Sequence, residues 1–440
     1  MTPGTETGSP PRVLDLFCGA GGFAEGFRQA GFVCVAANDV DASAGATFEY
    51  NHRHHGTKFV LGDIASPAVR EQIFHHLGRQ AVDVVVGGPP CQAFSQVRNH
   101  HRIIDDSRNR LYREFVSIVK NLSPKVFVME NVPGLQNLAG GTVRQQILED
   151  LTLNGDYLVQ SRIVDAADFG VPQTRLRVIF IGVRADLGMA PTFPIPVQAL
   201  DSLKLDRIPA RARARKKGYL WEYVLEPALP LIGNYLRDQL LNPWDLSLVT
   251  VKQAIGDLAH LRPSTRLLRH PSDAALSYEL PAVSSYQLAR RAESRELVNA
   301  DVPHIREDTI DRLTVIPPGG NFRDLPKKLS KRYLNGKKWG PELGKSHLSR
   351  KYYFAYRKLH PDYLSWTLNT KADCVYHYGA PRALTVREFA RLHSFDDTYH
   401  FLFGDRHSRY RQVGNAVPPL LAKAIAEAIR PLLATGVGED

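Results

Sequence analysis

Short apolar runs alternate with longer mixed segments through the first 185 residues. Four of these runs, each ending in glycine or a polar residue, occupy residues 12–17 (RVLDLF), 32–39 (FVCVAAND), 82–88 (VDVVVGG) and 125–131 (KVFVMEN). Such continuous runs predict strands buried on both faces, as in a parallel sheet. Segments of helical length, such as 22–30 and 110–122, lie between them. The pattern predicts repeated βα units of a doubly wound α/β sheet, whose ligands gather at the carboxyl ends of the strands.

Residues 186 to about 375 lose this rhythm and are expected to form a second, smaller domain. The chain has a net charge of +11, and residues 186–375 hold 30 Lys and Arg against 20 Asp and Glu. Basic runs occur there at 211–217 (RARARKK), 327–340 (KKLSKRYLNGKKWG) and 350–358 (RKYYFAYRK). Basic side chains interleaved with aromatic ones suit a polyanion with flat bases, although a single run could be only a solvated face.

The apolar stretches, the first residues and the cysteines indicate in which compartment the protein works. No apolar stretch approaches the length of a membrane span, and the first ten residues lack the features of a signal peptide. No C-x-x-C pair indicates a zinc site, and the cysteines are too few and too scattered for a disulfide framework. They are Cys18, Cys34, Cys91 and Cys374. We therefore expect a cytoplasmic protein with reduced thiols, no metal site and a disordered tail over residues 1–11.

The ends of the first predicted strands carry candidate ligand-binding residues. DLFCGAGGF (15–23) places glycines between a strand and a helix, where the backbone must approach a ligand closely. Asp39, about 20 positions further, suits ribose hydroxyl groups, and Asp63 ends a third candidate strand. Each acidic residue could instead start a turn, and a nicotinamide or flavin nucleotide would suit the glycines equally well.

The apolar run at residues 82–88 leads into GGPPC, residues 87–91. Here the two glycines leave space beside a ligand, and the two prolines stiffen the exit from the strand. Cys91 is thus expected just beyond the edge of the sheet, where a helix starting near Gln92 would favour its thiolate. An isolated cysteine is usually inert and buried, but this position predicts a nucleophile.

Two further segments supply companions for Cys91. Glu130 closes an apolar strand, where a partly desolvated carboxyl could carry a proton at neutral pH, although it could also be a helix cap or a salt-bridge partner. QTRLR (173–177) places Arg175 and Arg177 on one face of a predicted strand, pointing at a common target. A thiolate, a protonatable carboxyl and paired guanidinium groups predict a nucleophilic site.

These motifs together resemble those of the cytosine-5 DNA methyltransferases of bacterial restriction-modification systems. DLFCGAGGF resembles the S-adenosylmethionine loop, GPPCQAFS the nucleophile loop, ENV the acidic motif and QTRLR the paired-arginine motif. The family's order is completed by DSRNRL (106–111), RALTVREFARLHSF (382–395) and QVGNAVPP (412–419). The likeness covers roughly residues 12–185 and 376–425.

The resemblance implies a Rossmann-like, discontinuous methyltransferase domain. Its first part would span 12–185 and its returning part 411–440, with a target-recognition domain over 186–380 and a hinge region over 381–410. S-adenosylmethionine is the implied cofactor and double-stranded DNA the implied partner. The chain is expected to be a monomer, with any cognate restriction endonuclease acting separately.

The resemblance also assigns residues. The catalytic set is Cys91, Glu130, Arg175 and Arg177. The residues expected around S-adenosylmethionine are Phe17, Gly19, Gly21, Asp39, Val40, Asp63, Ile64, Pro90, Leu111, Asn415 and Val417. DNA contacts are expected from Gln92, Ser95, Arg108, Arg211, Arg213, Arg215 and Lys331. Two positions depart from the family: Asp39 stands where glutamate is usual, and Asp396 replaces the proline that commonly follows the phenylalanine.

The implied reaction methylates C5 of a cytosine flipped out of duplex DNA. Because C5 is a poor nucleophile, Cys91 would add to C6 while Glu130 supports protonation at N3. The sequence does not identify the base that removes the C5 proton. An RNA (tRNA) cytosine-5 methyltransferase could use the same catalytic parts, and a non-catalytic DNA-binding homologue could share the motifs. The long basic middle segment favours duplex DNA, and the complete catalytic set favours an enzyme.

Overall fold

The computed structural model describes residues 9–90, 110–135, 142–196, 248–262, 274–326, 328–330 and 355–434. Several predicted site residues lie outside these ranges, namely Cys91, Gln92, Ser95, Arg108, Arg211, Arg213, Arg215 and Lys331. Most of the predicted N-terminal tail, residues 1–8, also lies outside them.

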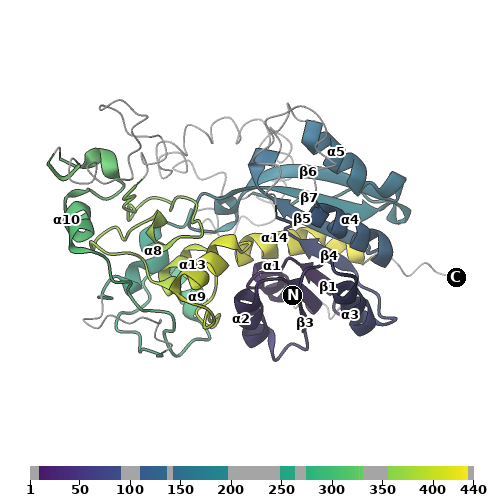
Figure 1. Cartoon of the computed structure of the whole chain (residues 1–440), viewed down its shortest axis with the longest axis horizontal. Coiled ribbons are helices and arrows are strands. Elements are labelled where there is room, and N and C mark those ends of the chain that lie inside the picture. The colour runs from purple at the N-terminus through teal and green to yellow at the C-terminus, as the bar shows by residue number, and fades with distance from the viewer. Residues whose placement is uncertain are drawn as a thin grey trace, which may run out of the picture.

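A seven-stranded sheet lies in the right-hand part of the structure as drawn in Figure 1. Its strands are β1 (Arg12–Leu16), β2 (Val33–Asp39), β3 (Lys58–Leu61), β4 (Val84–Gly87), β5 (Val126–Asn131), β6 (Tyr157–Asp165) and β7 (Leu176–Arg184). The order is β3-β2-β1-β4-β5-β7-β6, and β1 to β5 are parallel. The order reverses between β1 and β4, which is where doubly wound sheets bind their ligands.

The last two strands differ from the predicted repetition of βα units. β6 and β7 are antiparallel neighbours, and β7 also pairs antiparallel with β5. The apolar run of β7 is buried on both faces like the parallel strands, so its composition carries no sign of its direction. The α/β class is confirmed, whereas the expectation of βα units up to residue 185 is wrong for this hairpin.

Helices cover the sheet and continue into the second half of the chain. Those of the first half are α1 (Gly22–Gln29), α2 (Ala42–His52), α3 (Pro67–Leu77), α4 (Arg110–Leu122) and α5 (Thr142–Leu151). Those of the second half are α8 (Val251–Ile255), α9 (Ser285–Arg291), α10 (Glu307–Val315), α12 (Val386–Leu392), α13 (Arg406–Asn415) and α14 (Pro419–Ile429). Short 3-10 turns lie at Leu153–Gly155, Ala166–Phe169, Ala185–Leu187, Gly256–Leu258, Phe322–Asp324, Ala372–Cys374 and Arg430–Leu433.

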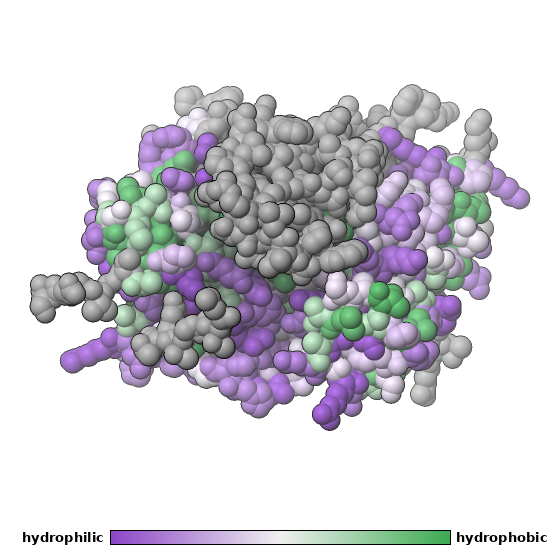
Figure 2. All heavy atoms as spheres, turned by 180° about the vertical axis from the view of Figure 1, so that it is seen from behind, coloured by the Kyte–Doolittle hydropathy of each residue, from purple (hydrophilic) through white to green (hydrophobic). Residues whose placement is uncertain are grey.

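The outer surface is mixed in character. Figure 2 shows hydrophilic residues over much of the face seen from behind, with separate groups of apolar residues among them. Within the described ranges, none of the helices has both the length and the apolar character needed to cross a membrane.

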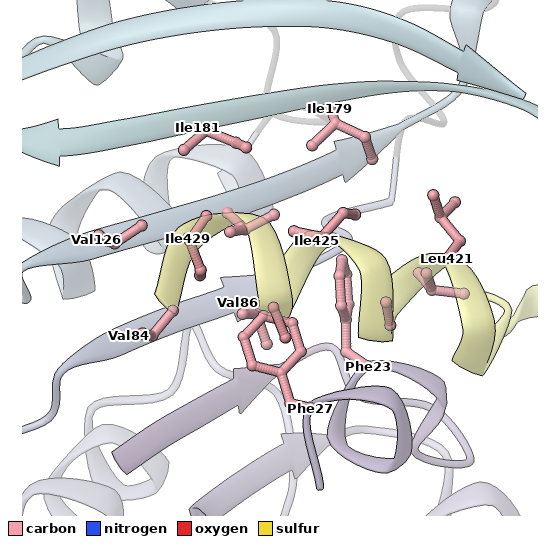
Figure 3. Packing of buried hydrophobic residues seen from close by; sticks show 14 of the residues in the cluster. Phe23, Phe27, Val84, Val86, Val126, Ile179, Ile181, Leu421, Ile425 and Ile429 are labelled. Carbon is pink, nitrogen blue, oxygen red and sulfur yellow. The ribbon is translucent and has the colours of Figure 1, made fainter. Parts of the chain in front are cut away.

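The two faces of the sheet bury separate hydrophobic clusters because side chains alternate along each strand. On one face, Val84 and Val86 pack with Phe27 of α1 and with Leu421 and Ile425 of α14 (Figure 3). On the other face the sheet packs against apolar side chains of α3, α4 and α5. The C-terminal helix therefore lies against the sheet formed by the first half of the chain.

A third cluster joins the middle of the chain to its C-terminal part. Val251 and Ile255 of α8 and Tyr286 of α9 pack with Phe389 of α12 and Tyr410 of α13. Side chains of the middle segment thus share a core with residues beyond the predicted boundary at 380. The division into domains stays a prediction.

Candidate active site

A cavity of about 880 Å³ opens at the carboxyl ends of β1, β2, β4 and β5. This is the size of a site for a small organic ligand. Its lining includes these predicted residues: Phe17, Gly19, Asp39, Val40, Asp63, Ile64, Pro90, Leu111, Glu130, Arg175, Arg177, Asn415 and Val417. Segments distant in sequence therefore meet at one sheet edge, and Gly21 is the predicted cofactor residue that this cavity does not include.

The loop after β1 bends so that its backbone faces the cavity. Phe17 and Gly19 both have positive φ angles, of 56° and 53°. The Gly19 amide donates to Oδ2 of Asp39 at 2.8 Å, and the Asp41 amide donates to Oδ1 of Asp39 at 2.8 Å. A Cβ atom added at Gly19 would have no heavy atom within 4 Å. Asp39 thus holds the loop in a form that leaves open space above Gly19.

Gly21 and Gly22 lie where the loop packs against the C-terminal half of the chain. A Cβ at Gly21 would lie 2.5 Å from the Tyr399 hydroxyl, and one at Gly22 would lie 2.1 Å from the Val417 carbonyl oxygen. The same Tyr399 hydroxyl donates to the Ala20 carbonyl. These glycines allow the C-terminal half of the chain to approach the loop, and the contact of Gly21 with a cofactor stays a prediction.

The ends of β2 and β3 form a second wall. Val40 is 70% exposed although it is apolar, whereas Ile64 beside the same cavity is buried. Asn38 joins the two strands because its Nδ2 donates to the Val60 carbonyl at 2.8 Å and to the Gly62 carbonyl at 3.0 Å. Burial raises the pKa of Asp39 above its ordinary value. Hydroxyl donors from a ligand would favour the charged carboxylate at this position.

The end of β4 makes room for the Glu130 carboxyl. A Cβ at Gly88 would lie 3.2 Å from Oε2 of Glu130, whereas one at Gly87 would lie 2.8 Å from the Leu16 carbonyl oxygen of β1. Gly88 therefore borders the candidate catalytic group, and Gly87 permits close packing within the sheet. Nδ2 of Asn131 donates to the Pro89 carbonyl at 3.2 Å, which ties the exit of β4 to the end of β5.

Glu130 forms an ion pair with Arg177 at the edge of the cavity. Both side chains are partly buried, with exposed fractions of 15% for Glu130 and 12% for Arg177. The pair therefore presents a carboxyl and a guanidinium group together, partly shielded from solvent. Such a combination can hold the polar edge of a planar ring and exchange a proton with it.

Arg175 and Arg177 both line the cavity, but they have different hydrogen-bond partners. Arg175 precedes β7, and its buried guanidinium donates to the backbone carbonyls of Leu368 at 3.1 Å, Gly414 at 2.8 Å and Ala416 at 3.2 Å. Burial and the neighbouring Arg177 lower the pKa of Arg175 well below its ordinary value. Arg175 thus fixes the backbone of the C-terminal segment, although part of it also lines the cavity.

The C-terminal wall includes a residue that sequence reasoning missed. Arg411 of α13 lines the cavity, and its guanidinium pairs with Oδ2 of Asp41 at 3.0 Å. Asp41 caps the N-terminus of α2 by accepting from the Ser43 and Ala44 amides. The pair therefore joins the wall that holds Asn415 to the end of β2. In the sequence, only its position directly before the motif at 412–419 sets Arg411 apart.

The chain is similar over most of its length to proteins of one known family. The model of the C-5 cytosine-specific DNA methylases matches residues 11–431. The type II methyltransferase M.AgeI of Thalassovita gelatinovora is 31% identical over 95% of this chain and 99% of its own. The type II methyltransferase M1.HphI of Haemophilus parahaemolyticus is 32% identical over 94% of this chain and 86% of its own.

A solved structure shares the fold. It comes from E. coli, is described as a DNA modification methyltransferase encoded within a prophage, and aligns with a TM-score of 0.64 at 23% identity. The alignment covers 96% of this chain and 99% of the other. The likeness therefore extends over the sheet and over the described residues of the second half.

Proposed function

This chain belongs to the C-5 cytosine-specific DNA methylase family, and from that membership we propose that it methylates C5 of a cytosine flipped out of a specific duplex DNA sequence. Membership makes it a DNA (cytosine-5-)-methyltransferase and implies a methyl donor. We propose S-adenosylmethionine as that donor. The observation that carries the proposal is that one cavity contains both the glycine loop with Asp39 and the ion pair of Glu130 with Arg177.

Three features of the cavity fit S-adenosylmethionine. The open space above Gly19 permits close approach of a ligand to the backbone. Asp39 holds the loop and retains lone pairs for ribose hydroxyl groups. Val40 and Ile64 offer apolar surface to an adenine ring. When bound, the cofactor supplies the electrophilic methyl group.

The catalytic proposal centres on Cys91, which is bonded to Pro90, a residue of the cavity lining. Its thiolate adds to C6 of the cytosine and makes C5 nucleophilic, while Glu130 supports protonation at N3. Arg177 orients the Glu130 carboxyl through their ion pair. After methylation, loss of the C5 proton and departure of the Cys91 thiolate restore the aromatic ring. Because C6 is out of reach inside a duplex, the base must be flipped.

The proposed DNA contacts lie outside the described residues. We assign contacts near the flipped base to Gln92, Ser95 and Arg108, and contacts to the phosphates to Arg211, Arg213, Arg215 and Lys331. Phosphate contacts fix the register of the protein on DNA without reading its sequence. We propose that the enzyme acts as a monomer and that any cognate endonuclease is a separate protein.

Methyl transfer to two nucleic acids tests this function. Duplex DNA and tRNA are offered separately with radiolabelled S-adenosylmethionine, and bisulfite sequencing locates the modified base in DNA from cells that express the protein. We expect 5-methylcytosine at one recurring duplex sequence. Glu130→Gln should lose most of this activity, whereas Glu149→Gln, on the exposed face of α5, should keep it. Transfer to tRNA alone would refute the choice of substrate.

A further inference from the structure

A buried histidine outside the cavity connects two of its walls. His393 follows directly after α12 and is fully buried. Its Nε2 lies 2.8 Å from the Ala416 carbonyl oxygen, and its Nδ1 lies 2.9 Å from Nε2 of Gln173. Ala416 stands between Asn415 and Val417, which both line the cavity. The imidazole thus joins the C-terminal wall to the segment that leads into Arg175 and Arg177.

The hydrogen bonds of Gln173 define which nitrogen of His393 carries the proton. The Gln173 amide nitrogen also donates to the Leu392 carbonyl at 2.8 Å, and its Oε1 accepts from the Leu368 amide at 3.2 Å. Turning this amide over would bring two oxygens together at Leu392 and two donors together at Leu368. The amide nitrogen therefore faces His393, whose Nδ1 must accept and whose Nε2 must donate to Ala416.

Charged groups around the imidazole favour the same neutral form. Burial and the positive charges of Arg175 and Arg177 lower the pKa of His393 well below its ordinary value, whereas its contact with Ala416 acts in the opposite direction. A second proton on Nδ1 would also face the donor group of Gln173. His393 is therefore held as a single neutral tautomer.

Two side chains consequently hold one carbonyl of the cavity wall. The Arg175 guanidinium donates to Ala416 at 3.2 Å and to Gly414 at 2.8 Å, and the His393 imidazole donates to Ala416 as well. We propose that His393 is a positioning residue for the methyl donor, which fixes the Ala416 carbonyl and thereby sets Asn415 and Val417 against the bound cofactor. This inference rests on the proposed S-adenosylmethionine site.

Two substitutions separate positioning from packing. His393→Phe keeps a planar ring but removes both hydrogen bonds, whereas His393→Gln can donate to Ala416 and accept from Gln173. By calorimetric titration with S-adenosylmethionine, His393→Phe should raise Kd roughly tenfold, the loss expected for one well-placed buried hydrogen bond. His393→Gln should recover most of the affinity. In assays, KM for the cofactor should rise in His393→Phe while kcat at saturation changes less than about threefold.

His377→Phe is the matched control. His377 is another buried histidine, whose Nδ1 accepts from the Gly379 and Ala380 amides and which does not line the cavity. Its replacement should lower the melting temperature without changing Kd more than about twofold. If His393→Phe also leaves Kd within twofold, or if His393→Gln binds no better than His393→Phe, the positioning role is refuted.

The wild-type protein provides a second measurement that does not depend on the ligand affinity of a variant. Nitrogen NMR of histidine-labelled protein should show, besides the imidazole of His377, that of His393 protonated at Nε2 only and without titration between pH 8 and pH 5.5. The His393→Gln spectrum assigns that signal by its loss. Protonation at Nδ1 would overturn the inference. Failure of the wild type to bind S-adenosylmethionine would instead overturn the proposed function itself.

Discussion

Replacing Arg391 with methionine should destabilise the protein strongly, because this guanidinium neutralises two buried carboxylates. Arg391 donates to Asp397 at 2.7 and 2.6 Å and to Asp257 at 2.8 and 3.1 Å, and the side chains of all three residues are fully buried. Removing one partner of a buried ion pair lowers the free energy of unfolding by about 3 to 5 kcal/mol. The cost should be measured as the shift of the urea midpoint multiplied by the slope of the transition.

The remaining partners place the expected cost at the lower end of this range. Without Arg391, Asp257 still has Arg291 at 3.2 Å. Asp397 still has Arg387 at 3.7 Å and the Tyr278 hydroxyl at 2.5 Å. We therefore expect a loss of about 3 kcal/mol at pH 7. Adding Asp397→Asn to Arg391→Met should recover part of this loss, because a buried carboxylate that has lost its two hydrogen bonds from Arg391 is removed.

The pH dependence of this loss follows from the sign of the pKa shift. Burial alone would raise the pKa of Asp397, but the hydrogen bonds from Arg391 and the charge of Arg387 outweigh burial and lower that pKa. In the wild type this stabilisation is present above the pKa of an unfolded Asp, about 3.9, and is lost as the pH falls through the folded value. In the variant the carboxyl takes up a proton at higher pH. The difference in stability should therefore shrink between pH 7 and pH 4.

An exposed ion pair provides the control for this experiment. Arg184 pairs with Asp186 at 2.7 Å on the surface, where solvent screens the charges, so Arg184→Met should shift the urea midpoint far less than Arg391→Met. A loss of stability in Arg391→Met no larger than in this control, or one that is the same at pH 7 and pH 4, would refute the role of Arg391 in neutralising the buried carboxylates.

Three further changes test separate parts of the site. Gly22→Ala places a Cβ 2.1 Å from the Val417 carbonyl oxygen, so we expect about 2 kcal/mol of destabilisation in thermal unfolding, whereas an unchanged midpoint would contradict this packing. Arg177→Met removes the partner of Glu130 and should lower kcat about 100-fold in methyl-transfer assays with little change in cofactor Kd; equal losses in both would show that Arg177 acts on the cofactor. Replacing four residues together with alanine should weaken binding to nonspecific DNA and reduce its salt dependence: Arg211, Arg213, Arg215 and Lys331. An unchanged slope of the logarithm of the binding constant against the logarithm of the salt concentration would exclude their contact with phosphates.

The sequence predicted the parts of the site that depend on local pattern. Apolar runs ending in polar residues located the carboxyl ends of the parallel strands, because strands buried on both faces need such runs. This placed Asp39 and Glu130 at one edge of the sheet, and the cavity there includes both. The direction of β7 was not predicted, because a strand in an antiparallel hairpin is buried as completely as its parallel neighbours.

The roles that depend on distant partners could not be read from the sequence. The two arginines of QTRLR look equivalent in the sequence. The guanidinium of Arg175, however, is buried and donates to backbone carbonyls that lie 193 to 241 residues further along the chain. Gly21 and Gly22 look like ligand-facing glycines, yet the atoms that exclude a side chain there belong to Tyr399 and Val417. His393 stands in a motif without any sign of its bond to Ala416.

The most direct test of the central claim is the capture of a covalent adduct on duplex DNA that carries 5-fluorocytosine at the methylated site. Fluorine at C5 permits methyl transfer but blocks the final elimination, so enzyme and DNA should stay joined after denaturation when S-adenosylmethionine is present. Mass spectrometry should locate the bond at Cys91, and Cys91→Ser should abolish it, since a serine hydroxyl forms far less of the nucleophilic anion at neutral pH. Cys18→Ser and Cys34→Ser should still form the adduct, because both thiols are buried. An adduct that survives Cys91→Ser, or that maps to another residue, would contradict the account.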